Sequence, residues 1–168
     1  MSKLPIIIAL GQEFRSDDGV GPWALQQAQI LFKQKCSYQH HRGDPTDLID
    51  LWQGRDALVL DAVVMDQQRE DPSHTGVHVL RPLEGDGTLK MKRSTSSHAF
   101  GLIEAVELGK ILGKLPQSLT IVAVEACDFG QGVHISAKVR SSLPHILAAI
   151  EQWLAQLPPS HHTRSHHA

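Results

Sequence analysis

Apolar and polar residues follow one another along this chain in blocks of two kinds. Short, nearly continuous apolar runs are typical of strands buried on both faces, and they occupy residues 4–10, 57–64 and 118–125. Longer segments have apolar residues at helical spacing, and they occupy residues 20–35, 99–112 and 141–157. Strands that alternate with helices predict a largely parallel sheet covered on both faces.

Two shorter segments add to this prediction. Residues 36–41 read as a short strand, and residues 76–82 alternate apolar and polar positions, which favours an edge strand that runs antiparallel. Asp44 and Pro45 form a good helix start, and we expect that helix to reach about Gln53 and to stop near Gly54. The expected fold class is therefore α/β, with a mostly parallel sheet and an antiparallel edge strand.

Composition sets the limits of the molecule. The 168 residues, 41% of them hydrophobic, suit one α/β domain over residues 1–157. Residues 158–168 hold four of the eleven histidines after two prolines and have nothing apolar to bury, so we expect a disordered, His-rich tail. The net charge of −2 offers no basic surface for nucleic acid, and no apolar run has the length of a membrane span.

The cysteines and the N-terminal residues favour a cytoplasmic protein. Cys36 and Cys127 lie far apart and form no CxxC motif, and the first residues lead into a strand without a signal-peptide cleavage pattern. We therefore expect reduced thiols. Cys127 follows a strand beside acidic residues, where it could border a site, but a buried and inert cysteine is the favoured interpretation.

Three places could carry chemistry. Asp17 and Asp18 follow the first apolar run, where a helix begins; they could cap that helix, or they could face a ligand at the carboxyl end of a strand. Asp61 interrupts an otherwise apolar strand, where a carboxylate is costly to bury unless it is paired, hydrogen-bonded or bound to metal. His98 stands at the start of the 99–112 helix, where the helix dipole favours the neutral imidazole that ligates metals.

Together, two carboxylates and one imidazole form a plausible open site for a divalent metal. Such an oxygen and nitrogen donor set suits zinc, and also nickel or iron. Purely structural roles for the same residues stay open. The chain has no GxSxG elbow, no Walker A loop, no HExxH and no GxGxxG, which argues against the enzyme classes built on those motifs.

The same residues carry a family resemblance. The segment GQEFRSDDGVG (11–21), Leu60-Asp61-Ala62, SSHAFG (96–101) and VEACDFGQG (124–132) follow in order. In this they resemble the maturation endopeptidases of nickel-iron hydrogenases over residues 4 to about 157. Gln12 stands where that family usually has asparagine, and Ala126 where it more often has glycine.

The resemblance implies a flavodoxin-like α/β/α sandwich and one activity. A cytoplasmic, monomeric endopeptidase of aspartic type would remove the C-terminal extension of the hydrogenase large-subunit precursor, after nickel has been inserted. The resemblance assigns Asp18, Asp61 and His98 to catalysis and to contact with the nickel. It assigns Gln12, Asp17 and Gly19 to substrate binding. The nickel would be carried by the precursor, and another divalent metal is possible.

Two mechanisms and two other functions stay open from the residues alone. The metal could polarise the scissile carbonyl and lower the pKa of a bound water, or Asp18 or Asp61 could act as general base. The alternatives to the maturation protease are a metal-binding or chaperone module that holds the same precursor without cutting it, and a general metal-dependent hydrolase.

Overall fold

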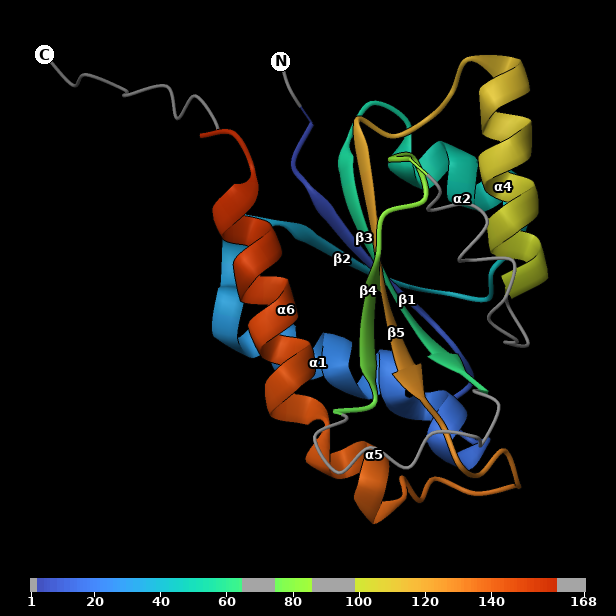
Figure 1. Ribbon diagram of the computed structural model, residues 1–168, viewed down its shortest axis with the longest axis vertical. Coiled ribbons are helices and arrows are strands. Elements are labelled where there is room, and N and C mark those ends of the chain that lie inside the picture. The colour runs from blue at the N-terminus through green and yellow to red at the C-terminus, as the bar shows by residue number, and fades with distance from the viewer. Residues whose placement is uncertain (1–2, 65–74, 86–98, 160–168) are drawn as a thin grey trace, which may run out of the picture.

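The fold is built on one twisted sheet, seen in a computed structural model that describes residues 3–64, 75–85 and 99–159. Among these residues the strands are β1 (Ile6–Leu10), β2 (Ser37–His41), β3 (Asp56–Val63), β4 (Val77–Leu80) and β5 (Ser118–Glu125). Their order across the sheet is β2-β1-β3-β5-β4 (Figure 1). Strands β2, β1, β3 and β5 are parallel, and β4 pairs antiparallel with β5 at the edge. The expected mostly parallel sheet with an antiparallel edge strand is confirmed.

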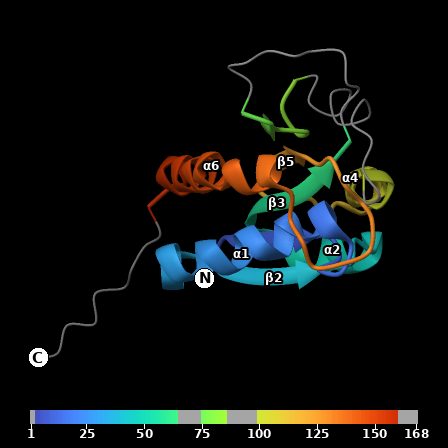
Figure 2. The same ribbon diagram turned by 90° about the horizontal axis from the view of Figure 1, so that it is seen from below.

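Helices cover both faces of this sheet. They are α1 (Val20–Phe32), α2 (Pro45–Trp52), α4 (Ala99–Leu112), α5 (Ala137–Ser141) and α6 (Leu143–Gln156), with 3₁₀ turns η1 (Ser16–Gly19) and η2 (Lys33–Lys35). Helices α1 and α6 lie on one side of the sheet and α2 and α4 on the other (Figures 1 and 2). The result is the three-layer α/β/α sandwich that the sequence predicts.

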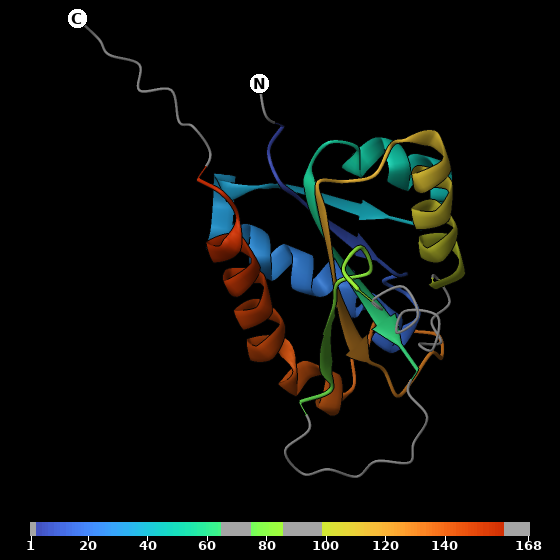
Figure 3. The ribbon, with the colours of Figure 1, turned by 45° about the horizontal axis from the view of Figure 1, so that its top comes forward.

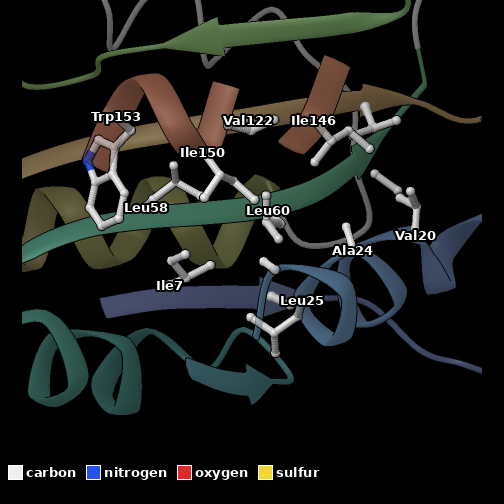
Figure 4. Close-up of a cluster of buried hydrophobic side chains, with 14 of the residues drawn as sticks. Ile7, Val20, Ala24, Leu25, Leu58, Leu60, Val122, Ile146, Ile150 and Trp153 are labelled. Atoms are coloured by element: carbon white, nitrogen blue, oxygen red, sulfur yellow. The ribbon is translucent and has the colours of Figure 1, made fainter. Parts of the chain in front are cut away.

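Each face of the sheet has its own apolar core because side chains alternate along a strand. Leu58, Leu60 and Ala62 of β3 pack toward α1 and α6, in the cluster drawn in Figure 4. Ala57 and Val59 pack toward α2 and α4. Burial on both faces explains why the central strands read as continuous apolar runs rather than as alternating ones.

The order of the strands creates one special position. The chain leaves β1 through α1 on one face to reach β2, and leaves β2 through α2 on the other face to reach β3. Strands β1 and β3 are neighbours in the sheet. The connection that leaves β1 goes to β2 on one side, whereas the chain that leaves β3 continues to strands on the other side. Such a switch point opens a crevice beyond the carboxyl ends of the two strands, where α/β proteins bind their ligands.

Capping residues and glycines in the sequence correctly predicted where two helices begin or end. The Asp44 carboxylate accepts hydrogen bonds from the backbone N–H groups of Thr46 (3.0 Å) and Asp47 (3.3 Å), as expected of a cap. Helix α2 ends before Gly54, which has a φ of 68°. Helix α4 ends before Gly113, which has a φ of 65°. In both places a left-handed residue follows the helix, a conformation that favours glycine.

The helix predicted over residues 141–157 is confirmed as α6, which begins at Leu143, but the short helix before it was not predicted. The structure has a short helix, α5, then Ser142, and then α6. Pro144 lies in the first turn of α6 and has no N–H to donate, and its ring would clash with the carbonyl four residues earlier. One continuous helix therefore cannot run from α5 into α6. The helix predicted over 20–35 also ends early, at Phe32, and a 3₁₀ turn follows it.

Within the described part of the chain, no helix has both the length and the apolar character needed to cross a membrane.

The core predicts a contrast between two identical substitutions. Ile150 in α6 is fully buried, whereas Ile111 in α4 is 82% exposed. We expect Ile150→Ala to lower the free energy of unfolding by about 2–5 kcal/mol and Ile111→Ala to change it by less than about 0.5 kcal/mol. Urea denaturation of both variants checks this, and equal losses would contradict the assigned core.

Candidate functional site

Two neighbouring acidic residues lie buried at the carboxyl end of β1. The chain leaves β1 at Gly11, whose φ is 122°, and returns through η1 so closely that a Cβ at Gly11 would overlap the carbonyl group of Asp18. Asp17 and Asp18 are both 0% exposed. The Asp18 Oδ2 atom accepts a hydrogen bond of 2.9 Å from the backbone N–H of Gln12. The loop after β1 therefore folds around the Asp18 carboxylate.

Asp61 lies beside this turn, on the adjacent strand. Ala9 of β1 pairs with Leu60 of β3, so Asp61 follows at the level of Leu10, where β1 ends. Asp61 is 2% exposed. Its side chain shares the α2 and α4 face with Val59 and Val63, because alternate residues of a strand point the same way. Asp18 and Asp61 thus both lie at the switch point, at the carboxyl ends of β1 and β3.

The start of α1 packs closely on the carboxyl ends of β1 and β3. Gly21 packs directly on the ends of both strands: a Cβ there would overlap the Leu10 carbonyl oxygen and lie 3.2 Å from the Leu60 carbonyl oxygen. A larger residue would push α1 away from the sheet. The N-cap of α1 is Gly19, so neither Asp17 nor Asp18 occupies the capping position of this helix.

His98, the third proposed ligand, lies outside the described residues. The helix that follows it, α4, begins at Ala99. A Cβ on Gly101 would overlap the Gly43 carbonyl oxygen, so the first turn of α4 lies against the segment that follows β2. Among the described residues, no three His, Cys, Asp or Glu side chains gather into a metal-binding group. A metal site made by Asp18, Asp61 and His98 stays a prediction.

Asp17 joins two loops that are distant in sequence. Its Oδ2 atom accepts hydrogen bonds from the backbone N–H groups of Cys127 (2.9 Å) and Asp128 (3.0 Å) and from the Ser136 hydroxyl (2.9 Å). Its Oδ1 atom accepts one from the Ser136 backbone N–H (2.7 Å). The carboxylate therefore anchors both ends of the loop between β5 and α5, which lies beside the start of α1 (Figures 1 and 3).

These hydrogen bonds set the charge of Asp17. Burial by itself raises the pKa of the carboxyl group, but the bonds from Ser136, Cys127 and Asp128 outweigh it and hold the pKa of Asp17 below its ordinary value. Asp17 is therefore a buried carboxylate at neutral pH, stabilised by N–H and O–H donors. Direct contact of Asp17 with a substrate stays a prediction.

The other two residues proposed to bind substrate lie on the same loop. The Gln12 side chain is exposed, and Gly19 is buried at the end of η1. Gly19 also lines a hollow of about 230 Å³ between the loop after β1 and the loop after β5. The mouth of this hollow carries two strongly exposed apolar side chains, Phe14 (71%) and Val133 (70%). The position of Gln12 and Gly19 beside Asp18 is compatible with their proposed role.

A second hollow lies where β2 ends and α2 begins. It has a volume of about 490 Å³ and a charged lining made by His40, His41, Arg42, Asp44 and Asp47. The His40 Nε2 atom lies 2.7 Å from the Gly11 carbonyl oxygen, to which it donates a hydrogen bond. This bond joins the end of β2 to the end of β1.

One polar group at this end of the sheet was missed in the sequence. The Glu125 carboxylate at the end of β5 lies 2.9 Å from His78 Nε2 and 3.7 Å from Lys138 Nζ. His78 sits on an edge strand with alternating character, so its position alone did not distinguish it from a solvated residue. Glu125 and His78 meet because β5 pairs with β4, a strand about 40 residues earlier in the chain. The local sequence around either residue does not show this pairing.

The two cysteines differ in their surroundings. Cys36 is buried, and burial raises the pKa of its thiol, which keeps it protonated. Cys127 is exposed, so the interpretation of Cys127 as a buried cysteine is wrong. Its backbone N–H donates a hydrogen bond to the buried Asp17 carboxylate, while the residue itself is exposed.

Comparisons with solved structures place the fold. The chain resembles the nickel-iron hydrogenase maturation protease HybD from Thermococcus kodakarensis, with a TM-score of 0.67, 19% identity, and coverage of 88% of this chain and 97% of that one. It also resembles an endopeptidase from Escherichia coli, with a TM-score of 0.72, 17% identity, and coverage of 89% and 91%. The hydrogenase maturating endopeptidase HybD from E. coli gives a TM-score of 0.65, 17% identity, and coverage of 88% and 93%.

Neither a protein-family model nor a curated protein sequence matches the chain. At identities below one fifth, the structural likeness establishes that this chain has the same fold as these proteases over most of its length.

The close packing at the start of α1 predicts different outcomes for Gly21 and Gly19. We expect Gly21→Ala to lower the free energy of unfolding by at least about 1–3 kcal/mol, because the added methyl group meets backbone atoms of β1 and β3. A Cβ on Gly19 would lie 3.4 Å from Glu13, so Gly19→Ala should change stability by less than about 1 kcal/mol. Thermal and urea unfolding of the two variants measure this, and equal stability of both would contradict the close packing of α1.

The buried carboxylate predicts a pH effect. A lowered pKa means that Asp17 stabilises the fold above its ordinary value of 3.8 and loses that effect as the pH falls through the folded-state value. Wild type should exceed Asp17→Asn in stability by roughly 2 kcal/mol at pH 7, and the difference should shrink below about pH 4. Unfolding curves at a series of pH values test this; a difference independent of pH down to pH 2 would contradict it.

Proposed function

We propose that this protein is an endopeptidase that matures nickel-iron hydrogenase, by removing a C-terminal extension from the large-subunit precursor after nickel insertion. The observation that carries the proposal is the pair of buried carboxylates, Asp18 and Asp61, which lie at the switch point beside the carboxyl ends of β1 and β3. Proteases of the hydrogenase maturation class have the same fold over about nine tenths of this chain. The order of the sequence motifs around these residues supports the same conclusion.

In this proposal the nickel ion belongs to the substrate. Asp18 and Asp61 supply carboxylate oxygens, and His98 supplies a neutral imidazole nitrogen, a donor set that suits a divalent ion. Nickel would polarise the scissile carbonyl or lower the pKa of a bound water. A precursor without nickel could not engage the two carboxylates in this way, so cleavage would wait for metal insertion.

Two further residues of the loop, Gln12 and Gly19, would hold the peptide. Gln12 is exposed, and its backbone N–H donates a hydrogen bond to the Asp18 carboxylate. Its side-chain amide can therefore both donate hydrogen bonds to a substrate backbone and accept them from it. Gly19 and Asp17 lie on the same turn. Asp18 or Asp61 would take the proton of the attacking water if no metal-bound hydroxide forms. The monomeric state and the cytoplasmic location stay predictions.

Intact-mass spectrometry of the precursor tests the function directly. We expect the nickel-loaded large-subunit precursor, incubated with this protein, to lose one discrete C-terminal peptide, and the nickel-free precursor to keep its mass. Binding without any mass change would favour a chaperone module instead. Cleavage of both precursor forms, together with unrelated peptides, would favour a general hydrolase.

The same assay tests the assigned carboxylates. Asp61→Asn keeps the size of the side chain but removes its charge, and we expect cleavage to slow roughly 10²- to 10⁴-fold, the usual contribution of such a group. Asp50→Asn, an equal change on the exposed face of α2, should cut at the wild-type rate. Circular dichroism would verify that both variants fold. Normal cleavage by folded Asp61→Asn would contradict the assigned site.

A further inference from the structure

Asp17 has an arrangement that the proposed reaction does not itself require. The carboxylate accepts four hydrogen bonds, from Cys127, Asp128 and the backbone and hydroxyl of Ser136. Ser136 is also the N-cap of α5, where its hydroxyl accepts a bond from the Val139 N–H. One side chain thus holds both ends of the loop that links β5 to α5.

Backbone contacts join the same two loops. Asp17 donates its own N–H to the Asp128 carbonyl (2.9 Å) and Ser16 donates to the Gly132 carbonyl (2.8 Å), while Gly132 donates to the Phe14 carbonyl (2.9 Å). Ser16 has a φ of 49°, which a residue with a side chain adopts at a cost. Contacts on both sides of Ser16 therefore keep this turn in a conformation that it would not hold alone.

Asp18 is the next residue of this turn. Its carboxylate is bound by the Gln12 N–H, and Gly11 packs on its carbonyl group, so the position of Asp18 depends on the path of the backbone from 11 to 18. That path is joined to the loop after β5 at Phe14, Ser16 and Asp17. The loop after β5 in turn supplies Val133 and Ile135 to the hollow beside Gly19.

We propose that Asp17 is a positioning residue: it holds the loop after β5 against the loop after β1, and so fixes the backbone that carries Asp18. This inference rests on the function proposed above. Asp17 acts through Asp18 and not on the substrate, since its carboxylate is fully buried and directed at Cys127, Asp128 and Ser136. Its removal should therefore affect kcat more than KM.

The test compares three variants on the nickel-loaded precursor. Asp17→Asn places an amide donor opposite N–H donors, and we expect kcat to fall about 10- to 100-fold, the usual effect of a small misplacement of a reacting group. KM should stay near the wild-type value. Ser136→Ala removes one of the four bonds and should give a smaller loss, and Ser136→Thr, which keeps the hydroxyl, should restore the wild-type rate.

A stability control separates positioning from folding. Ile150→Val trims the core under α6, away from the loops, and lowers the melting temperature without touching the turn. At a temperature where every variant is folded, we expect Ile150→Val to keep wild-type kcat. Amide hydrogen exchange at Cys127, Asp128 and Ser136 supplies a second readout, and it should be faster in Asp17→Asn than in either wild type or Ile150→Val.

The outcomes distinguish this inference from the proposed function. A wild-type kcat in Asp17→Asn, or a loss equal to that of Ile150→Val, would overturn the positioning role while the proposed function stands. If wild type leaves the precursor intact although the three amides exchange faster in Asp17→Asn, the proposed function fails and Asp17 keeps only a structural role. A selective fall in kcat with faster exchange supports the inference.

Discussion

The burial of negative charge at the end of β1 is the constraint on which this end of the molecule depends. Asp17 and Asp18 are neighbours, and both side chains are withdrawn from water. A buried carboxylate is tolerated only when donors surround it. The donors are backbone N–H groups of the loops themselves, from Gln12 for Asp18 and from Cys127, Asp128 and Ser136 for Asp17. The two carboxylates therefore shape the loops as much as the loops hold them.

Close packing of the backbone supports the same arrangement. Gly11 lets the chain turn back on Asp18, and Gly21 lets α1 begin directly on the ends of β1 and β3. The switch point then places Asp61, on the neighbouring strand, beside the turn. The strand order and two glycines therefore bring the turn that carries Asp18 against the strand that carries Asp61. Hydrogenase maturation proteases share this fold.

Much of the fold was predictable because its signals are local. The apolar run 118–125 and the helical spacing over 99–112 match β5 and α4 to the residue. A strand buried on both faces leaves a continuous apolar run in the sequence, whereas a helix buried on one face leaves apolar residues three or four positions apart. The strand order was not predictable, because the period of a strand does not report its partner. The short helix α5 was missed, because its five residues are too few to show a helical period in the sequence.

The residues of the candidate site were also predictable only where their signals are local. Asp18 and Asp61 stood out because a carboxylate next to or within a buried strand needs an explanation. Asp17 also stood out, but its partners lie more than a hundred residues away, so its contacts with Cys127 and Ser136 were beyond any local pattern. The Glu125 and His78 pair was missed for the same reason. His98 lies outside the described residues, and its place in the site stays a prediction.

The most direct test of the account is a crystal structure of this protein bound to a nickel-loaded precursor whose cleavage is blocked by a substitution at the cut, with the nickel located by anomalous scattering. The account predicts nickel within bonding distance of the Asp18 and Asp61 carboxylates, with the blocked peptide bond beside it. Nickel held by the precursor alone, with the peptide bound away from the ends of β1 and β3, would contradict it.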